Sequence, residues 1–265
     1  MNQRVSSLVN VHTVSFRQTL RHLSSAQKSA ASGAPPYSLY INRRAGKYVA
    51  AAAYNAGWSP NRVSGVSALL TFSGIALLAT ASNAWWVGTS VWALLAMGYA
   101  FDSADGQVAR LRGGGSPEGE WLDHVLDSAK LSTLHLAVLI AAHRNFGLPS
   151  EAWLLVPIAF SAIAAVSFFS MILNDQLKAI YSVKRGSLGT GVERSLLKSI
   201  LLVPTDYGVL CFLFIFVGSP DIFIAGYTLF FIANSGHLIL ASHKWFNDMK
   251  KIGSAINTTR LRGES

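Results

Sequence analysis

The sequence predicts an all-α integral membrane protein with six transmembrane helices and an N-terminal interfacial amphipathic helix. The first indication is composition. Of the 265 residues, 51% are hydrophobic and only 13% are charged, whereas a soluble domain normally carries about a quarter of charged residues. The second indication is the presence of long apolar runs, because a helix needs about 20 apolar residues to cross a bilayer.

The segments before the first apolar run differ from the rest of the chain. Residues 1–36 are polar, rich in Ser and Ala, and end in SGAPP, which indicates a mobile basic cytoplasmic arm that touches anionic lipid. In residues 37–58, apolar side chains such as Tyr40 and Tyr48 recur at helical spacing, with Arg43 and other basic residues between them. This pattern is typical of a helix that lies in the membrane interface.

The transmembrane domain is expected to occupy residues 59–245, and a cytoplasmic basic tail follows at residues 246–265. Trp58, Ser59 and Pro60 predict a turn and a helix start just before the first span. The expected spans are residues 62–82, 85–104, 122–142, 152–173, 197–218 and 221–241.

Basic residues determine the expected orientation. If the N-terminus is cytoplasmic, the connections and ends on the cytoplasmic side hold nearly all the Arg and Lys outside the spans, and the opposite face holds only Arg144. Cytoplasmic loops of membrane proteins carry such an excess of basic residues. Both termini are therefore expected in the cytoplasm, as is the connection between the second and third spans.

That connection contains an unusual concentration of acidic residues. Six of the thirteen Asp and Glu lie between Phe101 and Asp127, in a chain whose net charge is +9. At 100° per residue, Asp102 and Asp105 share one face of a helix that extends the second span, and Asp123 and Asp127 share one face of the third helix. The Gly-rich reversal RLRGGGSP between them lets the helices stand antiparallel. Four carboxylates should then converge at the cytoplasmic mouth of the membrane.

Converging carboxylates repel one another unless cations pair with them. Ligation by oxygen alone favours Mg²⁺ or Mn²⁺, and four carboxylates can hold two ions at the spacing of about 4 Å that clamps attacking and leaving oxygens in phosphoryl transfer. The alternative is a solvated surface loop, which is our interpretation of Glu118 and Glu120. For the four aspartates, the directional helical spacing favours a metal site.

One motif resembles the signature of the CDP-alcohol phosphotransferases, also called CDP-alcohol phosphatidyltransferases. It reads Asp102-x2-Asp105-Gly106-x2-Ala109-Arg110-x8-Gly119-x3-Asp123-x3-Asp127, with every defined position filled. The six expected spans and the basic N-terminal helix also resemble this family. The resemblance implies an enzyme that transfers a substituted phosphoryl group from a CDP-linked alcohol to an acceptor hydroxyl and releases CMP.

The resemblance also implies a role for each motif residue. The four aspartates would hold two divalent ions, and Asp127 would also act as the general base toward the acceptor hydroxyl. Arg110 would neutralise the diphosphate of the donor through fork-like hydrogen bonds. Gly106 and Ala109 would give the cytidine room against the helix. Three further donor-binding candidates are Ser116, Gly119, which would permit close approach of the third helix, and Asn61, for which a helix-start role fits equally well.

The acceptor site is less well defined. A phosphorylated acceptor requires cations near the aspartates, and Lys130 lies on the same helix face as Asp127, about one turn deeper. A local ion pair of Lys130 with Asp127 or Asp123 is our preferred interpretation. Asp206 is a candidate because it is an acid inside the fifth span, where it could instead pair with Lys130 or Lys198.

The connection between the fourth and fifth spans adds Arg185 and Arg194 to the acceptor candidates. Ordinary positive-inside topology explains both residues equally well. The expected partners are a CDP-linked donor, a hydroxyl acceptor, the lipid bilayer and a second copy of the chain. Gly98 and Gly226 could support helix packing and such a homodimer. No nucleic-acid partner is expected.

CDP-diacylglycerol is our preferred donor, with a small polar acceptor, which would place the enzyme in phospholipid synthesis. The reverse arrangement, in which a CDP-linked polar head group is passed to a lipid alcohol, stays open. An intramembrane prenyltransferase also uses Mg²⁺ and Asp motifs, but such enzymes usually carry two well-separated clusters over more spans. A cation transporter using the Asp cluster would place acids near mid-bilayer on discontinuous helices. The motif lies instead at a membrane edge beside an Arg, which favours an anionic substrate.

Overall fold

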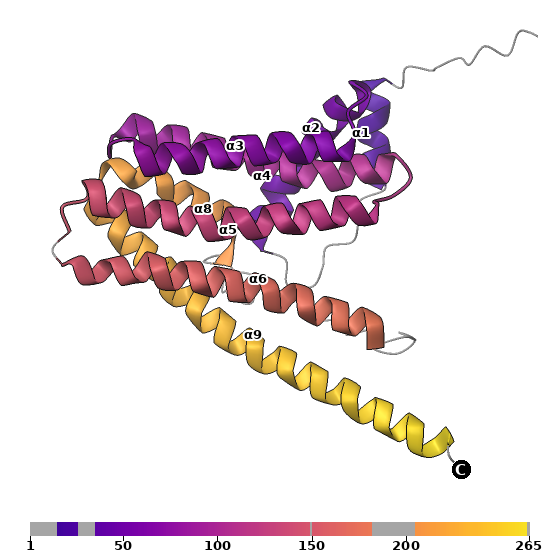
Figure 1. The fold of residues 1–265 in the computed structure, drawn as a ribbon. Coiled ribbons are helices and arrows are strands. Elements are labelled where there is room, and N and C mark those ends of the chain that lie inside the picture. Colours follow the sequence, from indigo (N-terminus) through magenta and orange to yellow (C-terminus); the bar gives the residue numbers. More distant parts are fainter. Residues whose placement is uncertain (1–14, 26–34, 149, 182–204, 264–265) are drawn as a thin grey trace, which may run out of the picture.

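The computed structural model describes residues 15–25, 35–148, 150–181 and 205–263, and within these residues the chain is helical without strands. Three antiparallel helices, α3 (Pro60–Thr80), α4 (Trp85–Leu111) and α5 (Pro117–Asn145), form the upper part of the bundle in Figure 1. Below them lie α6 (Leu155–Tyr181), which a 3-10 turn, η2 (Glu151–Leu154), precedes, and the long helix α9 (Pro220–Gly263).

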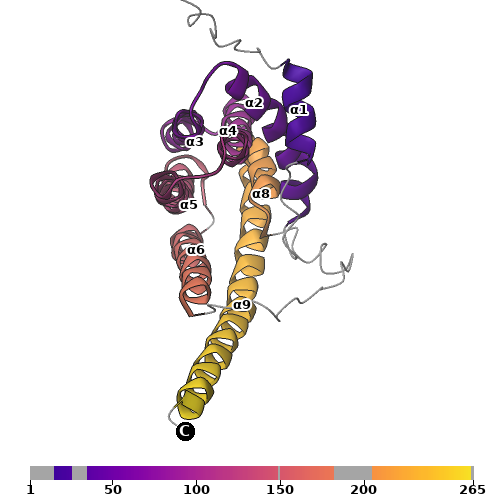
Figure 2. The same ribbon diagram turned by 90° about the vertical axis from the view of Figure 1, so that its right-hand side faces the viewer.

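The helices form two rows. In the end-on view of Figure 2, α3, α5 and α6 make up one row, and α4, α8 (Tyr207–Leu213) and α9 make up the other. A 3-10 turn, η4 (Phe214–Gly218), joins α8 to α9 and packs against α4. The arrangement brings the second expected span into contact with the first on one side and with the residues before α9 on the other.

Among the residues that the structure describes, four helical stretches are long and apolar enough to cross a bilayer: 60–80, 117–145, 151–181 and 220–254. They coincide with the first, third, fourth and sixth expected spans. The second expected span lies within α4, whose length of 27 residues is sufficient but whose C-terminal half is polar and acidic. Of the fifth expected span, residues 197–204 lie outside the described residues, and the remainder forms α8 and η4. The structure thus supports a helical membrane protein, with four candidate spans in the described part of the chain.

The expected start of the first span is confirmed. Ser59 Oγ accepts a hydrogen bond from the Arg62 N–H (3.3 Å), and Pro60 occupies the first turn of α3. A side-chain oxygen at this position satisfies an amide that has no partner within the helix, and Pro has no amide that would need one. Local chemistry therefore defines where α3 begins.

A buried polar contact ties α5 to α9. His135 Nδ1 lies 2.6 Å from the Tyr227 hydroxyl, and the imidazole stacks on Phe160 of α6 with ring centroids 3.9 Å apart. Both His135 and Tyr227 are at most 2% exposed. Burial of two polar groups inside a bundle is tolerated because each provides the hydrogen-bond partner of the other. His135 is thus a packing residue of the core.

Glycines at two helix crossings allow close approach within the chain. A Cβ on Gly98 would collide with the Thr71 side chain of α3, and a Cβ on Gly226 would lie 2.5 Å from Leu213. We expected both glycines to support helix packing, and they do so inside one chain. A homodimer contact at either glycine has no support from this geometry, because an intrachain neighbour already faces each position.

An N-terminal layer covers one flank of α4. It contains α1 (Phe16–Ser25), a π-helical turn η1 (Ser38–Asn42) and α2 (Arg43–Asn55). In α1, Leu23 is buried, and Thr19 Oγ1 donates a hydrogen bond to Asn55 Oδ1 of α2 (2.9 Å). The sequence predicts a mobile arm for residues 1–36, and the helix at residues 16–25 differs from that prediction. A helix of ten residues depends on tertiary packing for its stability, and local sequence does not show such packing.

Candidate functional site

The site is built on the hairpin of α4 and α5. Gly113 and Gly114, in the loop between the helices, have φ angles of 98° and 134°. Residues with a side chain rarely adopt such angles, whereas Gly does so at little cost. Ser116 Oγ then caps α5 by accepting a hydrogen bond from the Gly119 N–H (3.3 Å). The expected Gly-rich reversal is therefore present, and it places the acidic ends of both helices side by side.

Three of the four motif aspartates come together. Asp102, Asp123 and Asp127 each offer a carboxylate oxygen that lies within 4.8 Å of the other two. All three side chains are partly buried. Three carboxylates from two helices form a donor set of hard oxygens, which fits a divalent cation such as Mg²⁺ or Mn²⁺. The convergence that the motif spacing predicts is observed for these three residues.

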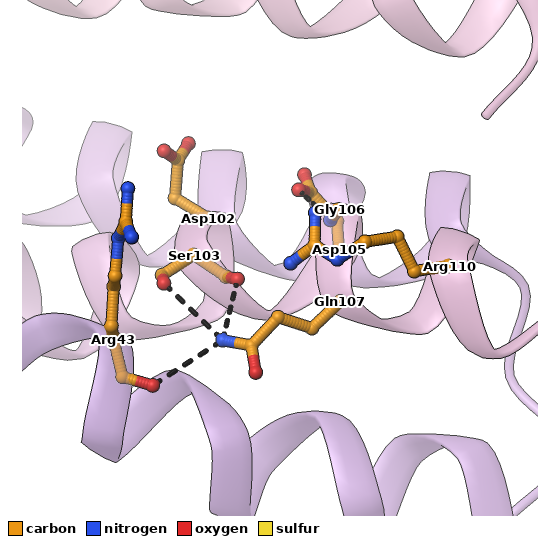
Figure 3. A pocket seen from close by; sticks show the side chains of 7 residues that line it. All are labelled: Arg43, Asp102, Ser103, Asp105, Gly106, Gln107 and Arg110. Carbon is orange, nitrogen blue, oxygen red and sulfur yellow. Dashed lines mark hydrogen bonds between the residues drawn. The ribbon is translucent and has the colours of Figure 1, made fainter. Parts of the chain in front are cut away.

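Asp105 is oriented differently. Its carboxylate accepts a hydrogen bond from Ser64 Oγ of α3 (2.6 Å) and another from the Gly106 N–H, and the residue is 9% exposed. Figure 3 shows that its carboxylate nevertheless lies on the same side of α4 as that of Asp102. Asp105 is thus a neighbour of the three-carboxylate group rather than a member of it, and its role as a metal ligand stays a prediction.

Lys130 lies among the aspartates. Its ammonium group donates to Asp102 and to Asp127 (3.1 Å), and Ser67 Oγ of α3 lies 3.4 Å away. The residue is 8% exposed. The local ion pair with Asp127 is confirmed, and the pair with Asp102 links α5 to α4 in addition. Lys130 offsets part of the negative charge that the cluster carries.

We expect Lys130→Met to destabilise the protein most strongly when divalent ions are chelated. Removal of one member of a buried ion pair leaves an uncompensated charge, which costs about 3 kcal/mol. The melting temperature of the purified protein should therefore fall in EDTA, and Mg²⁺ should restore part of the loss. Lys244→Met, a change at an exposed lysine of α9, is the matched control. Equal melting temperatures for both variants in EDTA would contradict this assignment.

A cavity of about 200 Å³ adjoins the aspartates (Figure 3). The donor-binding candidates Gly106 and Arg110 line it, and Ala109 lies buried on the same helix. A Cβ on Gly106 would lie 3.6 Å from Arg110 Nη1. Burial, and then the nearby guanidinium of Arg43, lower the pKa of Arg110. An anion placed here would relieve the repulsion between the two guanidinium groups.

The three remaining donor-binding candidates lie close together. A Cβ on Gly119 would lie 3.3 Å from Ser116 Oγ and 3.4 Å from Asn61 Oδ1 at the start of α3. A side chain at position 119 would meet α3 only at ordinary contact distance, so the close-approach role expected for Gly119 stays a prediction. Contact of Ser116 and Asn61 with a donor stays a prediction.

Asp206 has a different environment from the one expected of an acceptor ligand. Its carboxylate caps α8 by accepting a hydrogen bond from the Gly208 N–H (3.0 Å), and it accepts another from the Ser38 N–H of η1 (3.2 Å). The residue is 1% exposed. Asp206 thereby connects the N-terminal layer to α8. Of the other acceptor candidates, Lys130 lies among the aspartates, whereas Arg185 and Arg194 lie outside the described residues, as does Lys198.

Asp206→Ala should lower the free energy of unfolding by about 2 kcal/mol, because it removes a helix cap and leaves the partly buried amide of Ser38 without its acceptor. Thermal unfolding in detergent measures the effect. Asp221→Ala, at an exposed acid in the first turn of α9, is the control. If the two variants unfold at the same temperature, the carboxylate of Asp206 does not hold these segments together.

Sequence reasoning missed the hydroxyl groups of α3 that face the aspartates. Ser64 contacts Asp105, whereas Ser67 lies 3.4 Å from Asp102 Oδ1 and donates to the Gly98 carbonyl (2.9 Å). Ser64 and Ser67 are three positions apart in an apolar span, and this spacing is the sequence feature that could have revealed them. Such spacing places both on one helix face.

The family model of the CDP-alcohol phosphatidyltransferases matches residues 58–233. The match begins just before α3, includes the whole hairpin motif and ends within α9. No curated protein matches the chain at a significant level.

Proposed function

This chain belongs to the CDP-alcohol phosphatidyltransferase family, a family of phosphotransferases, and from that premise we propose that it transfers the phosphatidyl group of CDP-diacylglycerol to the hydroxyl of a small polar acceptor. CMP is the second product, and the reaction serves phospholipid synthesis. The observation that carries the proposal is the group of Asp102, Asp123 and Asp127 at the ends of two adjacent helices. Family membership gives the reaction class, and the three carboxylates provide a site at which this reaction can take place.

In this proposal, Asp102, Asp105, Asp123 and Asp127 hold two divalent ions, Mg²⁺ or Mn²⁺. When bound, the ions neutralise the diphosphate of the donor and polarise its phosphoryl oxygens. To bind a cation, Asp105 would exchange its hydrogen bond with Ser64 for a contact with the ion. Its hydrogen-bonded partner is a neutral hydroxyl, so this exchange breaks no ion pair.

The chain's own groups perform the remaining tasks. Arg110 binds the diphosphate, for which a planar guanidinium offers two parallel hydrogen bonds. Asp127 accepts the proton of the acceptor hydroxyl while the oxygen of that hydroxyl forms a bond to the β-phosphorus of the donor. The bond between this phosphorus and the CMP leaving group breaks at the same time. Lys130, which donates to Asp127, is then available to orient that carboxylate or to bind an anionic acceptor.

The membrane placement is also part of the proposal. Tyr40, Ile41 and Tyr48 are 52–60% exposed on η1 and α2, which supports an interfacial position for this layer, with apolar side chains facing lipid. The active site then opens to the cytoplasmic leaflet, where both termini lie and where a lipid-linked donor can enter from the bilayer. A homodimer remains part of the expected assembly.

Release of CMP from purified protein tests the function. The protein, in lipid nanodiscs with Mg²⁺, is incubated with CDP-diacylglycerol, CDP-choline and related donors against a panel of acceptors. Release of CMP that requires CDP-diacylglycerol and a polar alcohol supports the proposal. Release that requires CDP-choline and a lipid alcohol would assign the reverse arrangement. Release of pyrophosphate from a prenyl donor, or cation flux in liposomes without any transfer, would assign another class.

A further inference from the structure

The N-terminal layer contributes a cationic side chain to the cavity beside the aspartates. Six of the seven residues that line this cavity belong to α4, and the seventh is Arg43 in the first turn of α2. In Figure 3, the guanidinium groups of Arg43 and Arg110 approach the cavity from opposite ends, on the side of α4 from which the carboxylates of Asp102 and Asp105 project. Arg43 is partly buried, whereas its neighbour Arg44 is exposed.

Close packing holds α2 against α4. A Cβ on Gly46 would lie 2.8 Å from the Ser103 side chain, and Ala50 and Ala51 are fully buried one turn further along α2. Small residues at these positions let the two backbones approach each other. Because Arg43 is three residues before Gly46, it lies on the same face of α2, so this packing directs it toward the cavity.

A hydrogen bond fixes the start of α2 in addition. Gln107 Nε2 donates to the backbone carbonyl of Arg43 (3.3 Å) and to the Ser103 carbonyl (3.0 Å), and Gln107 is 3% exposed. The buried side chain of Gln107, on the helix that carries the aspartate motif, thus holds the main chain of Arg43 in place. A main chain that is held in place in this way lowers the backbone entropy that is lost when the residue binds a ligand.

The charges of the cavity fit a diphosphate that arrives with divalent cations. Guanidinium groups at both ends can each form charge-assisted hydrogen bonds with phosphate oxygens, while the carboxylates of Asp102 and Asp105 would hold the cations. We propose that Arg43 is a second diphosphate-binding residue of the donor site, delivered by α2 opposite Arg110. The proposal rests on the proposed function. It also goes beyond the family match, since that match begins at residue 58.

Binding of CDP to the full-length protein in Mg²⁺, measured by titration calorimetry, tests the proposal. Arg43→Gln should weaken CDP binding about tenfold or more, because a hydrogen bond to a charged group is lost, while the weaker binding of cytidine stays unchanged. Arg43→Lys should recover part of the loss. The matched control is Arg44→Gln on the same helix. In the transfer reaction, Arg43→Gln should raise the KM for the CDP donor and leave the KM for the acceptor unchanged.

The outcomes separate this inference from the proposed function. If the unmodified protein binds neither CDP nor cytidine and releases no CMP, both fail. If it binds CDP and Arg43→Gln binds CDP equally well, the role of Arg43 alone is overturned. A parallel loss of CDP and cytidine binding, or an increase only in the Mg²⁺ concentration required, would show that Arg43 serves packing or charge balance, which also overturns the inference. A raised KM for the acceptor alone would assign Arg43 to the other substrate.

Discussion

Asp127→Asn should reduce turnover by about 10³-fold, which is within the range that a general base contributes. The Asp127 carboxylate belongs to the three-carboxylate group and accepts a hydrogen bond from Lys130 (3.1 Å). An amide of the same shape cannot accept the proton of the acceptor hydroxyl. It still presents one oxygen to a cation, so the fold and most of the affinity for CDP should persist.

The measurement is the rate of CMP release at saturating donor, together with CDP binding and the melting temperature of each variant. Glu120→Gln is the matched control, because Glu120 is an exposed acid on the same helix. If Asp127→Asn turns over as fast as the unmodified protein, another group takes the proton. If CDP binding is lost with turnover, the main role of Asp127 is to hold the donor through the cations.

Removal of divalent ions should abolish CMP release, and addition of Mg²⁺ or Mn²⁺ should restore it. Without cations, oxygens of three carboxylates lie within 4.8 Å of one another, and Lys130 neutralises only part of their charge. The carboxylates would then repel the negatively charged diphosphate of the donor. The loss corresponds to several kcal/mol of stabilisation of the transition state, which is about 10³-fold or more in rate.

The assay is CMP release after treatment with EDTA and after stepwise addition of Mg²⁺ or Mn²⁺. Thermal unfolding provides a second readout, because a ligand that binds the native state at 100 times its Kd stabilises it by about 2.7 kcal/mol. Asp123→Asn should reduce the stabilisation by Mg²⁺, whereas Glu118→Gln, at an exposed position of α5, should not. Full activity in EDTA would contradict a mechanism based on metal ions.

Much of the site could be predicted from local sequence. The Gly-rich reversal, the start of α3 at Pro60, the helical spacing of the aspartates and the pairing of Lys130 with Asp127 are all confirmed. Each depends on residues within about thirty positions of one another, where helical periodicity and backbone preferences decide which side chains share a face. The family match agrees with the motif, because the residues that it covers, 58–233, include the hairpin.

Contacts between distant segments could not be predicted in this way. Asp206 accepts from an amide 168 positions earlier in the chain, and its candidacy for the acceptor site came only from its position in an apolar run. The Asp105 carboxylate accepts a hydrogen bond from Ser64, which lies on another helix, α3. Nothing in the local pattern indicates which of several neighbouring polar groups a carboxylate will reach.

The sequence by itself determined the helical membrane class and the hairpin that brings the aspartates to one edge, because hydrophobicity and helical periodicity are local properties. Tertiary structure decided that α1 and α2 pack on α4, that Lys130 bridges two helices, and that Arg43 reaches the cavity beside the aspartates. These features depend on the shapes of facing helix surfaces, such as the close approach at Gly46. That complementarity exists only once helices distant in the chain have come together.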